Sequence, residues 1–315
     1  MPKVSIIIPV YGVEKYIERC ARSLFEQTLD DIEYLFIDDC TPDKSVEILK
    51  RVLEEYPHRK SQVVIHRMEQ NSGQAKVREW GMRNATAEYI IHCDSDDWVE
   101  TDMYRIMYED AKRTDADIVM CGYKATDGVK VFKECYHQQT NKAKLLSSLL
   151  ILHESWSVWN KMCKRSLYDS DIVYPTLAMG EDMVLTTQMV LNAQRIAVVN
   201  KALYNYFYNP NSITKVQSES SRYKHWKDSA ENAKTVIAIF KKKGLEHKYA
   251  NELLYLKFLQ KILAGDFARK KKYSKEWLEM FQEINLRTFS NPFISKSGKM
   301  KFLVKLLYAE ILNVI

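Results

Sequence analysis

The sequence predicts an α/β fold with a mostly parallel, Rossmann-like sheet, followed by a helical extension. Over the first 120 residues or so, β-branched runs alternate with amphipathic helical patterns in four strand–helix units. Such units join parallel strands through right-handed crossovers. Ligands bind beyond the carboxyl ends of these strands, so a site is expected near residues 9–12, 38–41 and 94–97.

The first unit has the clearest pattern. Residues 3–9 are mostly β-branched and apolar, as in a strand buried on both faces. The helix that follows is expected to place Val13, Ile17, Cys20 and Leu24 along one face.

The second unit contains a helix start signal. After an expected strand over residues 32–37, Thr41 is typical of an N-cap and Pro42 of the first helical position. Asp43 would then lie at the positive end of the helix dipole. A helix is therefore expected to begin at Thr41.

The other elements are predicted by the same periodicities. Further strands are expected over 63–65, 89–91, 118–120 and 203–208. Helices are expected over 74–85, 101–113, 143–152, 181–193, 224–242, 246–264, 274–286 and 298–315.

Charge divides the chain into two parts. The 315 residues carry a formal charge of +6. Residues 1–220 hold 27 basic and 32 acidic side chains, whereas residues 221–315 hold 20 and 9. We therefore predict an acidic α/β domain over 1–220 and a basic helical region over 221–315.

Several classes of protein are not supported. No apolar run approaches the roughly 20 residues that cross a bilayer, and no secretory signal pattern is present. The six cysteines lack zinc-site or CxxC spacing, as in a reducing compartment. No nucleic-acid-binding motif is found, so a cytoplasmic protein without a nucleic-acid partner is expected.

Carboxylates gather where the ligand edge of the sheet is predicted. Asp38 and Asp39 end the second strand, and Asp94, Asp96 and Asp97 follow the fourth. Clustered carboxylates repel one another unless a cation lies between them, and Mg²⁺ or Mn²⁺ shared with phosphate oxygens is the natural answer. The alternative is that these residues are helix N-caps, which explains one such Asp more easily than two clusters.

Five ordered motifs resemble inverting family 2 glycosyltransferases of the GT-A fold, of the bacterial polysaccharide-biosynthesis type. They span about two-thirds of the chain: Ser5-Ile6-Ile7-Ile8-Pro9-Val10-Tyr11-Gly12, Ile37-Asp38-Asp39-Cys40-Thr41-Pro42-Asp43-Lys44-Ser45, Asn71-Ser72-Gly73 with Arg78, Asp94-Ser95-Asp96-Asp97 and Gly180-Glu181-Asp182.

The resemblance implies a nucleotide-sugar site at the strand ends. Its residues would be Pro9, Val10, Tyr11, Asp38, Asp39, Arg78, Asp94 and Ser95. Tyr11 would stack on uracil, Asp39 would bind the base or ribose, and Arg78 would lie near the nucleotide or its phosphates.

The resemblance also implies a metal and a catalytic base. Asp96, with Asp97, would hold Mn²⁺ or Mg²⁺ on the donor diphosphate, and Asp182 would take the proton of the acceptor hydroxyl. From the residues alone, an N-cap or first-turn acid of the following helix is the preferred explanation of Asp182, and the two roles are compatible.

Three residues are implied on the acceptor side: Glu181, Trp159 and Lys161. Aromatic faces suit sugars, but a buried tryptophan is the more common explanation. Two departures from the family pattern, Gly12 and Glu79, occur at the donor-site motifs.

The implied activity is metal-dependent, inverting transfer of a sugar from a nucleotide diphosphate, UDP being expected, to a saccharide or lipid-linked saccharide hydroxyl. A sugar nucleotidyltransferase is an alternative, but residues 9–12 lack its glycine-rich, basic phosphate loop. A non-catalytic nucleotide-sugar-binding protein of the same fold is another, which the intact carboxylate set disfavours.

The C-terminal segment, residues 298–315, places lysines among apolar residues. One interpretation is a basic amphipathic helix lying on the inner face of the cell membrane. The other is a helix that packs on the transferase domain or at a homodimer contact, with its lysines in water.

Overall fold

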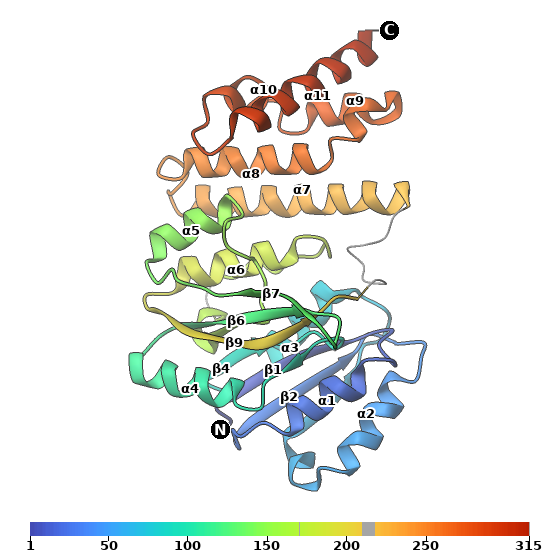
Figure 1. Ribbon diagram of the computed structural model, residues 1–315, viewed down its shortest axis with the longest axis vertical. Coiled ribbons are helices and arrows are strands. Elements are labelled where there is room, and N and C mark those ends of the chain that lie inside the picture. The colour runs from blue at the N-terminus through green and yellow to red at the C-terminus, as the bar shows by residue number, and fades with distance from the viewer. Residues whose placement is uncertain (170, 210–217, 315) are drawn as a thin grey trace.

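The computed structural model describes residues 1–169, 171–209 and 218–314. Within these ranges a nine-stranded mixed sheet lies between two layers of helices, and further helices stack beyond one of them (Figure 1). The strands are β1 (Val4–Val10), β2 (Ile32–Asp38), β3 (Val63–Arg67), β4 (Tyr89–His92), β5 (Trp98–Val99), β6 (Ile118–Thr126), β7 (Val131–Cys135), β8 (Lys161–Lys164) and β9 (Ile196–Phe207).

The sheet is parallel in its first half and mixed in its second. Its order is β3-β2-β1-β4-β8-β6-β9-β5, with β7 also paired to β6. The first four strands are parallel, and Val10 at the end of β1 pairs with Asp38 at the end of β2. The predicted parallel sheet is therefore confirmed there. Beyond β4 the sheet is mixed, within the predicted mostly parallel class: β8 is inserted between β4 and β6 and runs antiparallel to both, whereas β6 pairs with β9 in parallel.

Helices cover both faces of the sheet. They are α1 (Ile17–Phe25), α2 (Ser45–Glu54), α3 (Gln74–Asn84), α4 (Met103–Thr114), α5 (Lys142–Leu150), α6 (Glu181–Asn192), α7 (Glu219–Lys242), α8 (Ala250–Leu263), α9 (Lys271–Glu279), α10 (Ile284–Arg287) and α11 (Lys296–Val314). None of the helices in the described ranges is long and apolar enough to span a bilayer.

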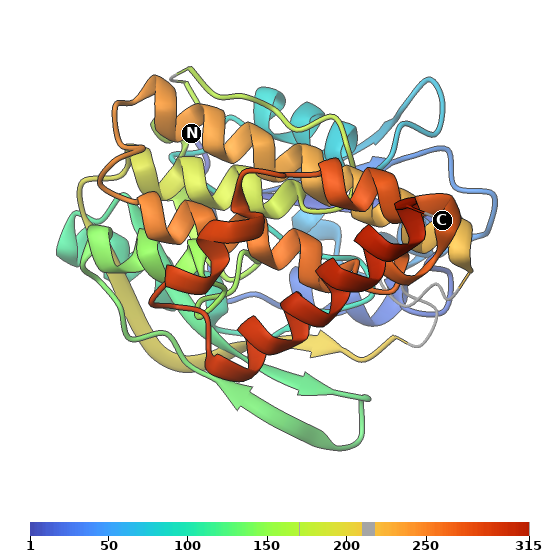
Figure 2. The same cartoon turned by 90° about the horizontal axis from the view of Figure 1, so that it is seen from above.

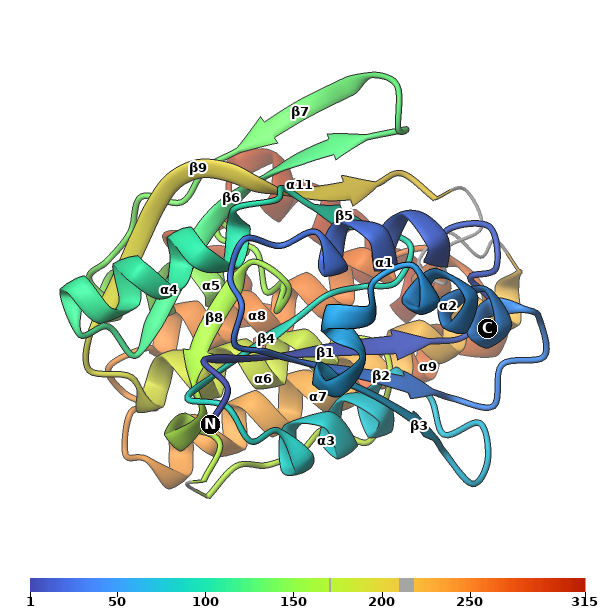
Figure 3. The ribbon, with the colours of Figure 1, turned by 90° about the horizontal axis from the view of Figure 1, so that it is seen from below.

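Alternation along β1 creates two hydrophobic cores. Ile6 and Ile8 belong to the core under α1, α2 and α4, a side visible in Figure 3. Ile7, pointing to the opposite face, joins the core made with α3, α5 and α6. All three side chains are fully buried, which explains why the strand has no polar alternation.

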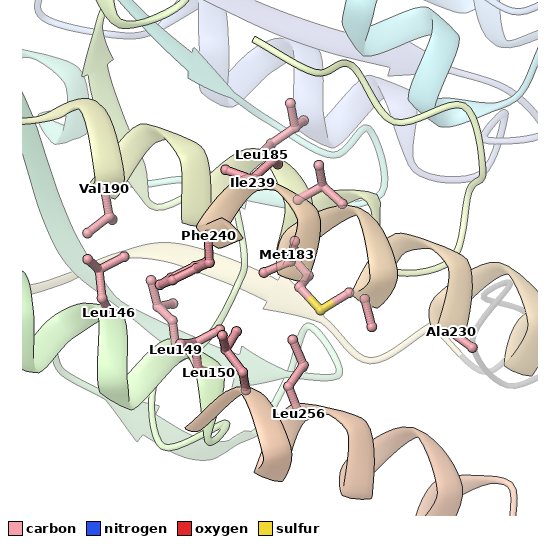
Figure 4. Close-up of a cluster of buried hydrophobic side chains, with 14 of the residues drawn as sticks. Leu146, Leu149, Leu150, Met183, Leu185, Val190, Ala230, Ile239, Phe240 and Leu256 are labelled. Atoms are coloured by element: carbon pink, nitrogen blue, oxygen red, sulfur yellow. The ribbon is translucent and has the colours of Figure 1, made fainter. Parts of the chain in front are cut away.

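The second core continues into the C-terminal helices. Leu149 of α5, Met183 of α6, Phe240 of α7 and Leu256 of α8 lie in one cluster (Figure 4). The stack ends with α11, which lies over the other helices when the molecule is seen from above (Figure 2). Residues 221–314 thus share a core with the sheet domain.

The second helix begins later than predicted. The Thr41 hydroxyl accepts a hydrogen bond from the Gly12 N–H at 2.9 Å, so Thr41 links the ends of β2 and β1. Asp43 instead accepts from the Ser45 N–H at 3.1 Å, and α2 starts at Ser45. The expectation of an N-cap at Thr41 was wrong because its hydroxyl serves a neighbouring loop.

Two other helix boundaries differ from the periodicity. Val13 lies before α1 rather than on its face. The helix expected over 274–286 is divided into α9 and α10, because Met280 is extended and Phe281 has a φ of +50°. The apolar spacing continues across this break because both short helices pack on the same core.

Candidate active site

A cavity of about 390 Å³ opens at the carboxyl ends of the parallel strands, where a ligand site was expected. Its wall contains residues from five chain segments: Pro9, Val10, Tyr11, Gly12, Val13, Asp39, Asn71, Gly73, Gln74, Val77, Asp94, Ser95, Asp96, Tyr206, Phe207 and Asn209. Most of the predicted nucleotide-sugar residues therefore meet in one place.

The end of β1 forms one wall. Tyr11 is 50% exposed, so its ring is available for a flat ligand to stack on. Gly12 follows with a φ of +68°, a backbone shape that glycine adopts without strain. The departure at Gly12 is therefore explained by the turn.

The two aspartates at the end of β2 have different positions. Asp39 lines the cavity and accepts hydrogen bonds from the N–H groups of Ser72 (2.7 Å) and Gly73 (2.9 Å). It thereby fixes the 71–73 loop against the cavity. Asp38 is buried outside the lining, where it accepts from the Thr41 N–H at 2.7 Å and pairs with Arg67 at 2.6 Å.

The segment after β4 supplies the other carboxylates. Asp94, Ser95 and Asp96 line the cavity. Asp96 accepts a hydrogen bond from the Asn209 amide at 3.0 Å. Burial raises the pKa of Asp96, and the neighbouring charge of Asp94 acts in the same direction. This local excess of negative charge favours a cation.

Asp97 differs from its neighbours because it is turned into the protein. It is 1% exposed and accepts hydrogen bonds from the Tyr204 hydroxyl and the Phe207 N–H, both at 2.6 Å. Burial raises the pKa of this carboxyl well above its ordinary value. Asp97 thus attaches β9 to the 94–97 segment, outside the cavity lining.

Arg78 connects the donor-side carboxylates to α6. Its buried guanidinium donates to Asp94 at 2.6 Å and also pairs with Glu181, the first residue of α6. Burial raises the pKa of Glu181 to about 7, although the Arg78 charge opposes the shift. Glu181 was predicted on the acceptor side, but in the structure it lies in the interior, in the ion pair with Arg78.

Asp182 lies in the first turn of α6, half-buried, next to this ion pair. Burial raises the pKa of Asp182, while the nearby charges of Arg78 and Lys161 lower it. An aspartate with a raised pKa is better suited to accept a proton near neutral pH.

The other two acceptor-side predictions fall in the interior. Trp159 stacks on Tyr204, with ring centroids 4.2 Å apart. Lys161 is 3% exposed, and its ammonium donates to the carbonyls of Ser155 (3.0 Å) and Ser157 (2.8 Å). Burial lowers the pKa of Lys161 to about 8. The more common explanation, a buried tryptophan, fits the structure.

Sequence reasoning missed one wall of the cavity. Tyr206, Phe207 and Asn209 enter it from the end of β9, more than 100 residues after Asp96 in the chain. Arg19 supports this wall, with its guanidinium 3.7 Å from the Trp98 ring centroid and 4.6 Å from that of Phe207. In the sequence, this wall could have been suspected only from Asn209, a polar residue that directly follows the aromatic strand predicted over 203–208.

The donor atoms of the cavity suit a hard divalent cation. No three His, Cys, Asp or Glu side chains in the described ranges stand close enough to enclose a metal by themselves. Asp94 and Asp96 nevertheless line one cavity, and Mg²⁺ and Mn²⁺ typically combine one or two carboxylates with water and phosphate oxygens. The residues therefore fit a metal that arrives with a diphosphate.

A larger hollow, of about 640 Å³, lies between α7 and α9. Its charged residues are largely matched, as in the Lys227–Glu276 pair and the 2.7 Å Lys257–Glu283 pair. The smaller cavity is the better candidate because three carboxylates, Asp39, Asp94 and Asp96, line it at the sheet edge where a ligand site was expected.

Comparison with known proteins identifies the family. The sequence profile described as Glycosyl transferase family 2 matches residues 5–176, which include both carboxylate clusters. The chain belongs to glycosyltransferase family 2. This family 2 glycosyltransferase is 32% identical over 235 residues to the uncharacterized glycosyltransferase EpsJ of Bacillus subtilis, covering 71% of this chain and 67% of EpsJ.

A second relative has been solved with a ligand. TarS of Staphylococcus aureus, a poly(ribitol-phosphate) β-N-acetylglucosaminyltransferase, is 27% identical over 81% of this glycosyltransferase, which spans 43% of TarS. The crystal structure of TarS residues 1–349 with UDP-GlcNAc superposes with a TM-score of 0.65 at 18% identity, covering 99% of this chain and 90% of that one.

The fold is also found in an archaeal enzyme. A mannosyltransferase from Pyrobaculum calidifontis, in complex with GDP-Man and Mn²⁺, superposes with a TM-score of 0.57 at 16% identity, covering 99% and 87% of the two chains. These superpositions confirm the predicted GT-A fold with its C-terminal helices.

Proposed function

We propose that this family 2 glycosyltransferase moves a sugar from a UDP-sugar to a hydroxyl of a saccharide or lipid-linked saccharide during synthesis of a cell-surface polymer. The observation that carries the proposal is the convergence of Asp39, Asp94 and Asp96 on one cavity. Asp182 lies outside the lining of that cavity, next to Glu181, which Arg78 links to Asp94. TarS, with its UDP-GlcNAc complex, supports the donor class and the polymer context.

The nucleotide would occupy the wall made by the end of β1. Tyr11 offers an exposed ring for the base, and Asp39 holds the adjoining 71–73 loop through two backbone N–H groups. We assign Asp39 the base or ribose contact. Asp38, bound to Arg67 and Thr41, supports the same turn from behind.

The diphosphate would lie beside Asp94, Ser95 and Asp96. We assign Asp96, with Asp94 near it, to hold Mn²⁺ or Mg²⁺, and Asp97 to hold the segment in place. A bound cation supplies neutralisation of the charge that develops on the leaving diphosphate.

Asp182 is the proposed base. Inversion requires one in-line displacement, in which the acceptor oxygen bonds to the anomeric carbon as the bond to the diphosphate breaks. The acceptor proton passes to Asp182, whose raised pKa favours that transfer. The Arg78–Glu181 pair fixes the first turn of α6, and so positions Asp182.

The experiment is a screen of UDP- and GDP-sugars for donor hydrolysis with Mn²⁺ present, measuring released nucleotide. We expect release of UDP from one or a few UDP-sugars, abolished by EDTA. Formation of UTP and sugar 1-phosphate when pyrophosphate is added would instead support the nucleotidyltransferase alternative. Tight UDP-sugar binding without release, even with added saccharide acceptors, would support the non-catalytic one.

A further inference from the structure

The outermost helix, α11, carries an apolar stripe that faces away from the protein. Its members lie on one face of the helix, at the spacing of a helical turn, and their exposed fractions range from 38% for Val304 to 61% for Met300. They are Met300, Val304, Leu307, Tyr308 and Ile311. At 1.5 Å per residue, this outer stripe extends about 17 Å along the helix.

The opposite face holds α11 on the molecule. Phe302, Leu306 and Ala309 are buried, and the Phe302 ring lies 5.6 Å from that of Phe258 in α8 and 5.8 Å from that of Trp277 in α9. A surface helix usually buries one apolar face and presents polar residues outward. The outer stripe is therefore not needed for attachment, and such a patch marks an interaction surface.

Cations flank the outer stripe. The Arg269 guanidinium lies 5.4 Å from the centroid of the Tyr308 ring, and the exposed Lys301 follows on the same side of α11. Lys305 is instead folded back against Gly265, where burial lowers its pKa and the charge of Asp266 opposes that shift. Glu310 is an exposed acid on the same helix. The whole 221–315 region carries 20 basic and 9 acidic side chains.

We infer that α11 docks in the plane of an anionic membrane surface, with the outer stripe in the headgroup boundary and Arg269 and Lys301 against lipid phosphates. Charge complementarity favours this occupant over a second copy of the chain. A symmetric pair joined through the stripe would bring the same cations of both copies together. Stable interfaces also need about 20–30 residues a side, far more than one stripe.

This inference goes beyond the proposed transfer reaction and depends on α11 and the neighbouring Arg269 alone. Its test is flotation of the purified full-length protein with vesicles of phosphatidylcholine alone or of phosphatidylcholine with phosphatidylglycerol. We expect flotation with the anionic vesicles only, weakened by high salt. The double variant Leu307→Glu/Ile311→Glu should float about tenfold less or worse.

Two controls separate docking from misfolding. Val129→Glu/Val131→Glu, in the exposed β6–β7 hairpin, should float like the wild type. Circular dichroism melting should be unchanged in both double variants, because all four residues are exposed. Lys301→Glu, on the flank, should reduce flotation while preserving the apolar stripe.

Three results would overturn the inference. One is equal partitioning of the wild type and the Leu307→Glu/Ile311→Glu variant. Another is the absence of flotation for the wild type. The third is a wild-type dimer, seen by size-exclusion chromatography with light scattering, that the stripe variant converts to monomer without any change in flotation.

Discussion

Neighbouring carboxylates of one short motif occupy different environments. Asp94 is paired with Arg78, Asp96 faces the cavity with Asn209, and Asp97 is buried against β9. The sequence predicts the presence of this cluster, because strand ends in a parallel sheet meet at one edge. It does not predict which carboxylate turns inward, since that depends on Tyr204 of a strand 107 residues away.

Asp96 and Asp97 therefore make a matched pair for testing the metal site. We expect Asp96→Asn to weaken Mn²⁺-dependent UDP binding by about tenfold or more, because a carboxylate oxygen is lost from the cavity. Asp97→Asn should leave that binding within about twofold. Isothermal titration with and without EDTA measures both, and a larger effect of Asp97→Asn would reverse the assignment.

Replacement of the proposed base should separate chemistry from binding. Asp182→Asn removes the proton acceptor but keeps the side-chain shape, so transfer should fall by about 10²- to 10⁴-fold. UDP affinity should stay within about twofold of the wild type. The exposed Asp30→Asn serves as the control, and a fully active Asp182→Asn enzyme would refute the base assignment.

The charge of Arg78 makes a prediction about pH. Arg78 favours the ionised form of Asp182, so Arg78→Gln should raise the pKa of that base. Since the ionised base is the active form, the acidic limb of the kcat/KM profile should move to higher pH. Arg83→Gln, on the exposed side of α3, should not move it. An unmoved limb in Arg78→Gln would show that Arg78 does not act on the base.

At the scale of elements, α6 is fixed by packing on both sides. Residues Met183–Leu191 are buried between the sheet side and α7, which places Asp182 at the edge of a rigid helix. This arrangement explains why the C-terminal region, although basic and distinct in composition, shares a core with the catalytic part. The domain boundary at residue 220 stays a prediction from composition, because the hydrophobic core continues across it.

Substitution of Phe240 in α7 tests whether α7 stabilises α6 through the core that they share. The Phe240 side chain is fully buried among residues of α5, α6 and α8, so Phe240→Ala should cost about 3–5 kcal/mol of the free energy of unfolding. Phe132→Ala, at a 53% exposed ring of β7, should cost less than about 1 kcal/mol. Urea denaturation measures both, and equal costs would mean that α7 does not support α6.

Element prediction succeeded where burial leaves a clear pattern. The strands β1, β2 and β4 were found because they are apolar runs buried on both faces. The strand β3 was found from its β-branched Val63-Val64-Ile65 run, although it is only partly buried. The strand β8 was missed because Lys161-Met162-Cys163-Lys164 contains no β-branched residue, and its place is set by β4 and β6. Contacts with distant parts of the chain determine the position of β8, as they determine the residue at which α2 begins.

At the scale of the whole molecule, the excess of acidic side chains and the excess of basic side chains lie in different layers. The acidic part surrounds the cavity at the sheet edge, and the basic part forms the helical stack that ends in α11 (Figure 1). The sequence alone predicts this charge difference and the carboxylates that belong to the site. Contacts across long separations, such as Arg78 with Glu181 or Asp96 with Asn209, required the structure.

The most direct test of the account is the anomeric configuration of the sugar that leaves the donor. With Mn²⁺ and the UDP-α-sugar selected by the donor screen, proton NMR can follow hydrolysis faster than mutarotation, with water as the acceptor. Single displacement assisted by Asp182 predicts that the β-anomer forms first. First appearance of the α-anomer would contradict the proposed inverting reaction.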